Sequence, residues 1–236
     1  DHCYHARPNP SPASYAMPRP ADTQTDAMSK LCPKLIFEGT RLTGKTELAF
    51  DLNEHPRLVG ARRYRYHSPL VSGEWCGFSN TPWGRGLINF APEETALAMA
   101  TYDTWATLFE QLRYYSWLVD RFHLSTRAWQ QVHAGRDLDF GWLEARLAPI
   151  GFRIVLCVRP PETFEAARAE RLKVSGKPDQ YDDLDVFIRE QALFESMAAE
   201  SALPVLRLDV SDGDRAAQCD RVADWLEATG GLHADY

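Results

Sequence analysis

Short apolar runs alternate with longer segments of helical periodicity along most of the chain. The apolar runs predict buried strands at residues 35–38, 58–61, 116–119, 153–158 and 204–208. Segments in which apolar residues recur every three or four positions predict helices at residues 45–53, 93–113, 140–148, 162–173, 184–200 and 214–228. Strands that alternate with helices are typical of a parallel sheet covered by helices. We therefore expect an α/β fold built on a five-stranded parallel sheet.

Two segments lack this periodicity. Residues 1–33 contain six of the 15 prolines and too few apolar residues to fold alone, which predicts a Pro-rich N-terminal arm. Residues 55–89 are rich in Gly, Pro, Arg and aromatic residues, and long irregular segments inside compact domains are usually functional or mobile. The sequence thus predicts one folded domain at residues 34–236, interrupted by an insert at 55–89.

Charge and composition exclude several classes of protein. The formal net charge of −7 argues against a protein whose main work is to neutralise a nucleic-acid backbone or an anionic membrane. No apolar run approaches the ~18 to 20 residues that span a bilayer. The five cysteines form no CxxC pair and are odd in number, which fits neither a disulfide framework nor a zinc module. We expect a reducing, cytoplasmic setting.

A phosphate-binding motif follows the first predicted strand and opens the first predicted helix. Its eight residues match G-x-x-x-x-G-K-[ST]: Gly39, Thr40, Arg41, Leu42, Thr43, Gly44, Lys45 and Thr46. Glycines let the backbone N–H groups and the helix N-terminus face an anion. Lys45 is expected to reach the β- and γ-phosphates, and the Thr46 hydroxyl to ligate Mg²⁺. The alternative is an ordinary Gly-containing turn between strand and helix.

The strand predicted at residues 116–119 is followed by Asp120 and Arg121. The chain shows neither the D-x-x-G and N-K-x-D motifs of switch GTPases nor the Asp-Glu strand end of AAA-type motors. A carboxylate and a guanidinium facing the phosphate loop suit phosphoryl transfer, which depends on positioning and charge neutralisation. Asp120 can orient Mg²⁺ through water or accept a proton from the acceptor. Arg121 can clamp the acceptor or bridge the two phosphates. A structural ion pair at a strand end is the alternative.

The segment from Asp120 to Gln130, with Ser125 inside it, resembles the D-R-[YF]-x-x-S-x-x-A-[YW]-Q segment of thymidylate kinases and related deoxynucleoside kinases. Glu38 and Gly39 match the opening of that family's phosphate loop, and residues 162–183 and 185–194 resemble its lid and the helix that follows. The resemblance covers residues 34 to about 228. It implies a P-loop NTPase fold, ATP and Mg²⁺ as cofactors, and a homodimer.

The lid is predicted at residues 168–183, where cations end a helix and precede a Gly- and Pro-containing loop. Such a segment can close over the transferring phosphates and exclude water. Arg168 and Arg171 are therefore candidate catalytic residues. Cations near a helix C-terminus are also favourable without any function, which is the alternative.

Acceptor binding is predicted mainly in the insert, where aromatic rings that stack a base neighbour guanidinium groups that hold a phosphate. The candidates are Arg63, Tyr64, Arg65, Trp75, Phe78, Ser125 and Gln130. A solvated basic loop is the alternative. We expect a kinase that acts on a nucleotide, nucleoside or related small molecule. Two alternatives remain: a nucleotide-binding protein that serves conformational switching or partner binding, and a kinase of a natural product or of a base in DNA.

Overall fold

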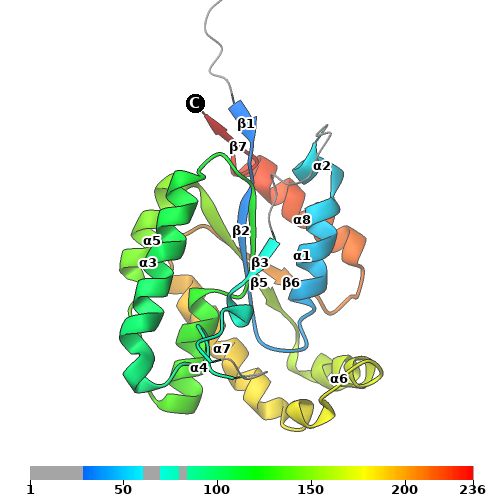
Figure 1. Cartoon of the computed structure of the whole chain (residues 1–236). Coiled ribbons are helices and arrows are strands. Elements are labelled where there is room, and N and C mark those ends of the chain that lie inside the picture. The colour runs from blue at the N-terminus through cyan, green and yellow to red at the C-terminus, as the bar shows by residue number, and fades with distance from the viewer. Residues whose placement is uncertain (1–28, 61–69, 80–83, 236) are drawn as a thin grey trace, which may run out of the picture.

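Five parallel strands form the central sheet of the computed structural model, which describes residues 29–60, 70–79 and 84–235 (Figure 1). In sheet order they are β3 (Leu70–Ser72), β4 (Trp117–Asp120), β2 (Lys34–Glu38), β5 (Phe152–Val158) and β6 (Val205–Asp209). Every pairing between neighbours is parallel. The predicted five-stranded parallel sheet is confirmed, and its central strand leads directly into the phosphate-binding motif.

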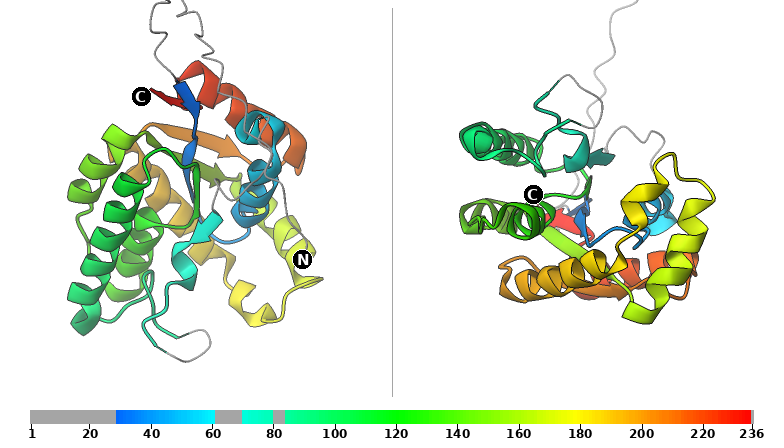
Figure 2. Two further views of the ribbon diagram at one scale, coloured as in Figure 1. Left: turned by 45° about the horizontal axis from the view of Figure 1, so that its top comes forward. Right: turned by 90° about the horizontal axis from the view of Figure 1, so that it is seen from below.

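Helices cover both faces of this sheet (Figure 2). One face carries α3 (Thr95–Gln111), α4 (His123–Ala134), α5 (Gly141–Leu147) and α7 (Leu184–Glu200), and the other carries α1 (Lys45–Glu54) and α8 (Arg215–Ala228). The alternation of side chains along β2 explains the two layers: Ile36 packs in the first core, whereas Leu35 and Phe37 pack in the second. All three side chains are fully buried.

Shorter elements complete the described chain. Two of these are the helices α2 (Pro56–Val59) and α6 (Phe164–Leu172). The others are five 3₁₀ turns: η1 (Gly73–Trp75), η2 (Pro92–Glu94), η3 (Ala148–Ile150), η4 (Pro161–Thr163) and η5 (Pro178–Tyr181). Helix α6 and η5, which overlap the predicted lid, share a small core of their own with Phe187 at the start of α7. Within the described ranges, no helix is both long enough and apolar enough to cross a membrane.

Two expectations about secondary structure were wrong. The strand predicted at residues 58–61 is the end of helix α2, which begins at Pro56, and the edge strand of the sheet is β3. A short apolar run does not distinguish a strand from a helix segment. Helix α4 was not among the predicted helices: its buried face includes polar residues such as His123, Ser125 and Gln130, which do not read as core positions in the sequence.

The predicted N-terminal arm ends earlier than residue 33. Strand β1 (Ser29–Leu31) pairs with β7 (His233–Asp235) in an antiparallel two-stranded sheet, and the N–H of Cys32 donates to the Leu232 carbonyl at 2.9 Å. Cys32 is buried. The boundary at residue 33 was therefore wrong for residues 29–33, and the rest of the predicted arm lies outside the described residues.

Candidate active site

The phosphate loop, residues 39–46, connects the end of β2 to the start of α1. Gly39 has a φ of 137°, and a Cβ atom there would lie 2.4 Å from the carbonyl oxygen of Cys157 on β5. Only glycine fits so close to the neighbouring strand. Gly44 precedes α1 with a φ of 61°, and no side chain caps the helix. The backbone N–H groups at the N-terminus of α1 thus have no side-chain cap from Gly44, which is the geometry that an anion-binding helix N-terminus needs.

Hydrogen bonds inside the loop fix its shape. The Thr43 hydroxyl and the Lys45 ammonium group both donate to the Thr40 carbonyl, each at 2.9 Å. The Thr40 hydroxyl in turn donates to Glu190 Oε2 on α7 at 2.5 Å. Leu42 has a φ of 67° and packs against the core of the lid. The loop is therefore held from α7 and contacts the lid.

Lys45 is buried beneath this loop. Burial, together with the positive charge of Arg121, lowers its pKa to about 8, although the carboxylate of Asp120 opposes the shift. The attraction between a buried cation and an anionic neighbour is stronger than that of an exposed cation, because less water screens it. Lys45 is thus placed to interact strongly with bound phosphates.

Thr46 and Asp120 meet where α1 begins and β4 ends. The Thr46 hydroxyl donates to Asp120 Oδ2 at 2.6 Å, while Asp120 Oδ1 is buried and makes no hydrogen bond to any described residue. The Ser72 hydroxyl donates to the Asp120 carbonyl at 2.9 Å and so ties β3 to β4 at this point. Mg²⁺ is usually bound by one or two protein oxygens together with substrate phosphates. The predicted pair, including its free carboxylate oxygen, fits that ion.

Arg121 forms an ion pair that sequence reasoning missed. Its Nε lies 3.1 Å from Oε2 of Glu74, which follows β3. Arg121 has a φ of 61°, an unusual conformation for a residue other than glycine. Its backbone is held on both sides, by Phe37 O at 3.0 Å and by the N–H of Gly73 at 3.1 Å. The guanidinium group is thus fixed at the edge of the sheet where the phosphate loop lies.

The charge of Glu74 is set by its cationic neighbours. Burial by itself raises the pKa of Glu74, but Arg121, Lys45 and Arg41 outweigh that effect and leave the pKa below its usual value. Glu74 is therefore ionised at neutral pH. The position of Glu74 just after a strand could have identified it as a candidate site residue. That signal was missed because the edge strand was predicted at residues 58–61.

Glu38 joins the phosphate loop to the start of α4. Its carboxylate accepts hydrogen bonds from the N–H groups of Phe122, Leu124 and Ser125 at 3.0–3.1 Å and from the Ser125 hydroxyl at 2.5 Å. Burial raises the pKa of Glu38, whereas these donors favour its ionised form. A carboxylate at a helix N-terminus is stabilising. Glu38 thus holds the Asp120–Arg121 turn in register with the loop.

The structure separates the predicted acceptor residues. Arg63, Tyr64 and Arg65 lie outside the described residues. Trp75 adjoins Glu74 and is 76% exposed, whereas Phe78 is half-buried against the core.

Ser125 and Gln130 have protein partners instead of a solvent-facing surface. Gln130 is fully buried, and its amide group donates to the carbonyls of Phe90 at 3.0 Å and Ile88 at 3.3 Å. Its carbonyl accepts from Arg136. Gln130 therefore fastens the segment before α3, and Ser125 supports Glu38. This arrangement contradicts the direct acceptor contact that was predicted for both side chains.

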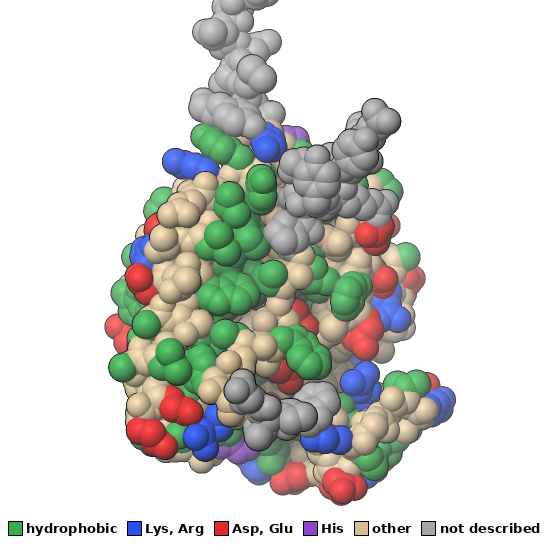
Figure 3. Space-filling model, viewed as in Figure 1, with side chains coloured by type: hydrophobic (Ala, Val, Ile, Leu, Met, Phe, Trp, Pro, Cys, Tyr) green, Lys and Arg blue, Asp and Glu red, His purple; other side chains and the backbone are tan. Residues whose placement is uncertain are grey.

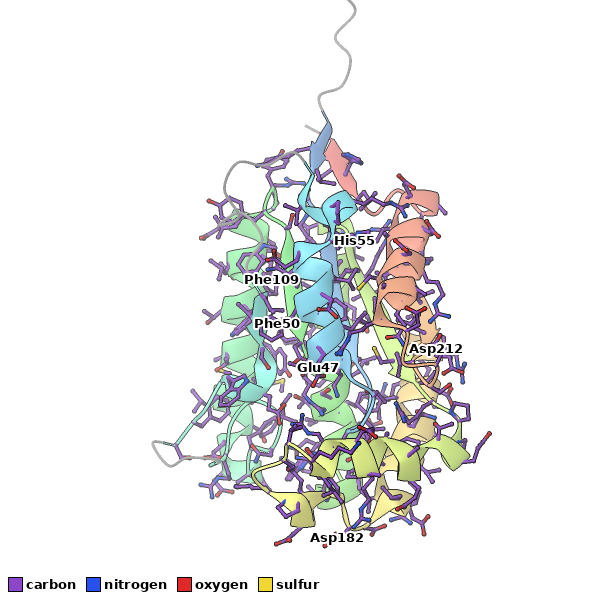
Figure 4. The ribbon with its side chains drawn as sticks, turned by 90° about the vertical axis from the view of Figure 1, so that its right-hand side faces the viewer. Glu47, Phe50, His55, Phe109, Asp182 and Asp212 are labelled. Atoms are coloured by element: carbon purple, nitrogen blue, oxygen red, sulfur yellow. The ribbon has the colours of Figure 1, made fainter. Side chains whose placement is uncertain are left out.

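The two lid cations differ in their contacts. Arg168 donates to the Tyr181 carbonyl at 2.8 Å and to Asp182 at 2.9 Å, both within the lid. Arg171 donates to the Tyr181 hydroxyl at 3.0 Å and lies 3.6 Å from Glu47 in the first turn of α1. In Figure 4, Glu47 and Asp182 lie on opposite sides of α6. Of these two arginines, Arg171 is thus the one beside the phosphate-loop helix. Figure 3 shows Lys and Arg side chains where the predicted lid meets the rest of the molecule.

No protein-family model and no curated protein sequence matches the chain. Solved structures do. The YorR protein from Bacillus subtilis, in complex with phosphorylated GDP, superposes with a TM-score of 0.55 at 15% identity, over 85% of this chain and 99% of that one. Deoxyadenosine kinase from M. mycoides with bound dATP gives 0.52 at 10% identity, over 83% and 99%. Thymidylate kinase from Candida albicans gives 0.50 at 17%, over 89% and 97%. The chain therefore has the fold of P-loop nucleoside and nucleotide kinases, as the sequence resemblance predicted.

Proposed function

We propose that the protein is a kinase that uses ATP and Mg²⁺ to phosphorylate a nucleotide, nucleoside or related small molecule. The observation that carries this proposal is the convergence of four groups at one edge of the sheet: Lys45, the Thr46–Asp120 pair, Arg121 and Glu74. Phosphoryl transfer needs few covalent steps from the protein, but it needs cations and a positioned acceptor around the transferred group. This set of residues supplies the cations, together with a carboxylate that can position an acceptor.

The donor side of the site follows from the loop. The N-terminus of α1 and Lys45 would hold the β- and γ-phosphates of ATP. Thr46 and Asp120 would hold Mg²⁺, directly or through water. When bound, the ion neutralises charge on the phosphate oxygens. Arg171 would approach the same phosphates from the lid, since it already lies beside the first turn of α1.

The acceptor side is assigned to Glu74 and Arg121. An ionised carboxylate can accept the proton of an acceptor hydroxyl as that oxygen attacks the γ-phosphorus. Arg121 keeps Glu74 ionised and would neutralise charge on the transferring oxygens.

A screen with labelled ATP against nucleosides, nucleotides and related metabolites tests the proposal. Wild type should label at least one acceptor, and Glu74→Gln should lower kcat by about 10²–10⁴-fold while ATP binding persists. Glu195→Gln is the matched control, because it breaks an exposed ion pair with Arg207 on the edge strand β6. If ATP binds but no acceptor is labelled, the kinase proposal is wrong and a switching protein fits better. If Glu74→Gln retains wild-type kcat, the base is another group.

We also infer a cytoplasmic protein, since all four cysteines in the described residues are free thiols, as a reducing compartment favours. The homodimer that the family resemblance implies stays a prediction, to be checked by sedimentation equilibrium of the full chain.

A further inference from the structure

A polar cavity lies at the opposite end of the sheet from the phosphate loop. Its volume is about 250 Å³, far more than one water molecule needs. It is bounded by the amino ends of β2 and β5, the turn after α3, η3 and the segment that leads into β7. Lys34 begins β2 and Glu38 ends it, so roughly 13 Å of strand separates this cavity from the loop. Its lining residues at the start of β2 and in β7 place it at the end of the sheet where Figure 1 shows β1 and β7, away from α6.

The walls of the cavity are cationic. Lys34, Arg113, Arg153 and His233 line it, and no Asp or Glu among the described side chains does. None of the first three forms an ion pair with an acidic side chain in the described parts of the chain, although most of the other described arginines do. In a chain with a net charge of −7, an acid-free pocket of this kind is unexpected. The gathered cations call for a negative charge that the described residues do not supply.

Two of these cations have donors that the protein leaves poorly satisfied. Lys34 is 2% exposed, and its ammonium group has only long contacts, at 3.4 Å to the Cys32 carbonyl and 3.7 Å to the Cys32 sulfur. Arg153 donates to the carbonyls of Gly151 and Thr229, but its Nε is buried without a hydrogen-bond partner among the described residues. Burying a charge without a counterion is costly. Burial, with Arg113 and Arg153 nearby, lowers the pKa of Lys34.

We propose that this cavity binds a phosphate group, either as the inorganic ion or as part of a small phosphate ester. Lys34 and Arg153 would donate charge-assisted hydrogen bonds to the phosphate oxygens from the floor of the cavity. Arg113, which is exposed, would close over the anion from the rim. The site is separate from the proposed kinase centre and does not depend on the kinase proposal.

The test measures the melting temperature of the full chain as inorganic phosphate replaces chloride at constant ionic strength. A ligand that binds the folded state raises this temperature with its concentration. Lys45→Ala serves as the background, because it weakens phosphate binding at the phosphate loop. Phosphate should stabilise this variant, and adding Lys34→Met should abolish the gain. Arg113→Gln in the same background should weaken phosphate binding roughly tenfold or more. Arg207→Gln, at an exposed arginine on β6 paired with Glu195, is the matched control and should change nothing.

The melting temperature in chloride alone distinguishes a ligand-binding role of Lys34 from a purely structural one. Lys34→Met removes a buried, unpaired charge, so its melting temperature in chloride should equal or exceed that of its parent. If Lys34→Met instead melts lower in chloride and retains the phosphate-dependent gain, the proposal is wrong. It is also wrong if phosphate fails to stabilise the Lys45→Ala variant. Repeating the titration with glycerol 3-phosphate shows which form binds: a larger gain than with inorganic phosphate identifies an ester site, and a smaller one identifies a site for the free ion.

Discussion

The Thr46 hydroxyl donates a 2.6 Å hydrogen bond to Asp120 Oδ2, although the two residues are 74 positions apart in the sequence. This bond joins the first turn of α1 to the end of β4 and leaves Asp120 Oδ1 without a protein partner. An oxygen pair of this kind is available to a cation before any nucleotide arrives. The contact between Thr46 and Asp120 therefore carries the proposed binding of Mg²⁺.

Asp120→Asn should weaken the binding of Mg²⁺ at the active site. The amide preserves the size of the side chain but removes the negative charge, so the Mg²⁺ concentration for half-maximal activity should rise on the order of 10–100-fold. Titration of Mg²⁺ at fixed ATP measures this shift. Asp103→Asn, at an exposed carboxylate paired with Arg146, is the control. An unchanged Mg²⁺ requirement would remove Asp120 from the metal site.

Lys45 should make the stability of the nucleotide-free protein depend on alkaline pH. Its pKa is about 8 in the folded chain and near 10.5 when unfolded, so between these values the unfolded state binds more protons. The free energy of unfolding should therefore gain a contribution of up to about 3 kcal/mol as pH rises from 8 to 10.5. Urea unfolding of wild type and Lys45→Met at pH 8 and pH 10 isolates this contribution. Equal pH responses in the two proteins would contradict it.

The bond between Thr40 and Glu190 should set the stability of the phosphate loop. Glu190→Ala leaves the buried Thr40 hydroxyl without its acceptor, which should cost about 1–3 kcal/mol of unfolding free energy and raise KM for ATP. Glu190→Gln retains an acceptor oxygen and should largely rescue both properties. Glu195→Ala, on the same helix, serves as the comparison in unfolding and steady-state assays. A normal KM in Glu190→Ala would show that α7 does not hold the loop.

The two lid arginines should differ in their kinetic effects. Arg171 lies beside α1, so Arg171→Ala should lower kcat on the order of 10³-fold, the range seen when a cation that stabilises transferring phosphates is removed. Arg168 binds Tyr181 and Asp182 within the lid, so Arg168→Ala should mainly raise KM for ATP by loosening that segment. Steady-state kinetics on both variants show which of them loses more kcat. A larger loss of kcat in Arg168→Ala would reverse the assignment.

Local sequence patterns were sufficient to predict the phosphate loop and most of the strands and helices. The loop depends on glycines and on a strand and helix that adjoin it, all within residues 34–54, so its motif carries its own structural context. The central strands were predictable because both of their faces are buried, which leaves continuous apolar runs. Helix α4 escaped prediction for the opposite reason: its buried face includes polar side chains that hydrogen-bond to other segments, as Ser125 does to Glu38 and Gln130 to the Phe90 carbonyl.

The sequence by itself determined the α/β class, the phosphate loop, and the Asp120–Arg121 strand end, because each is encoded by neighbouring residues. Only the tertiary structure decided that Glu74 pairs with Arg121, that Gln130 faces the protein interior, and that Lys34 and Arg153 line one cavity. The first and third relationships arise from the order of strands in the sheet, and the second arises from the packing of α4 against residues 88–90. That order depends on which long-range contacts bury the most apolar surface, and no local pattern of residues specifies it.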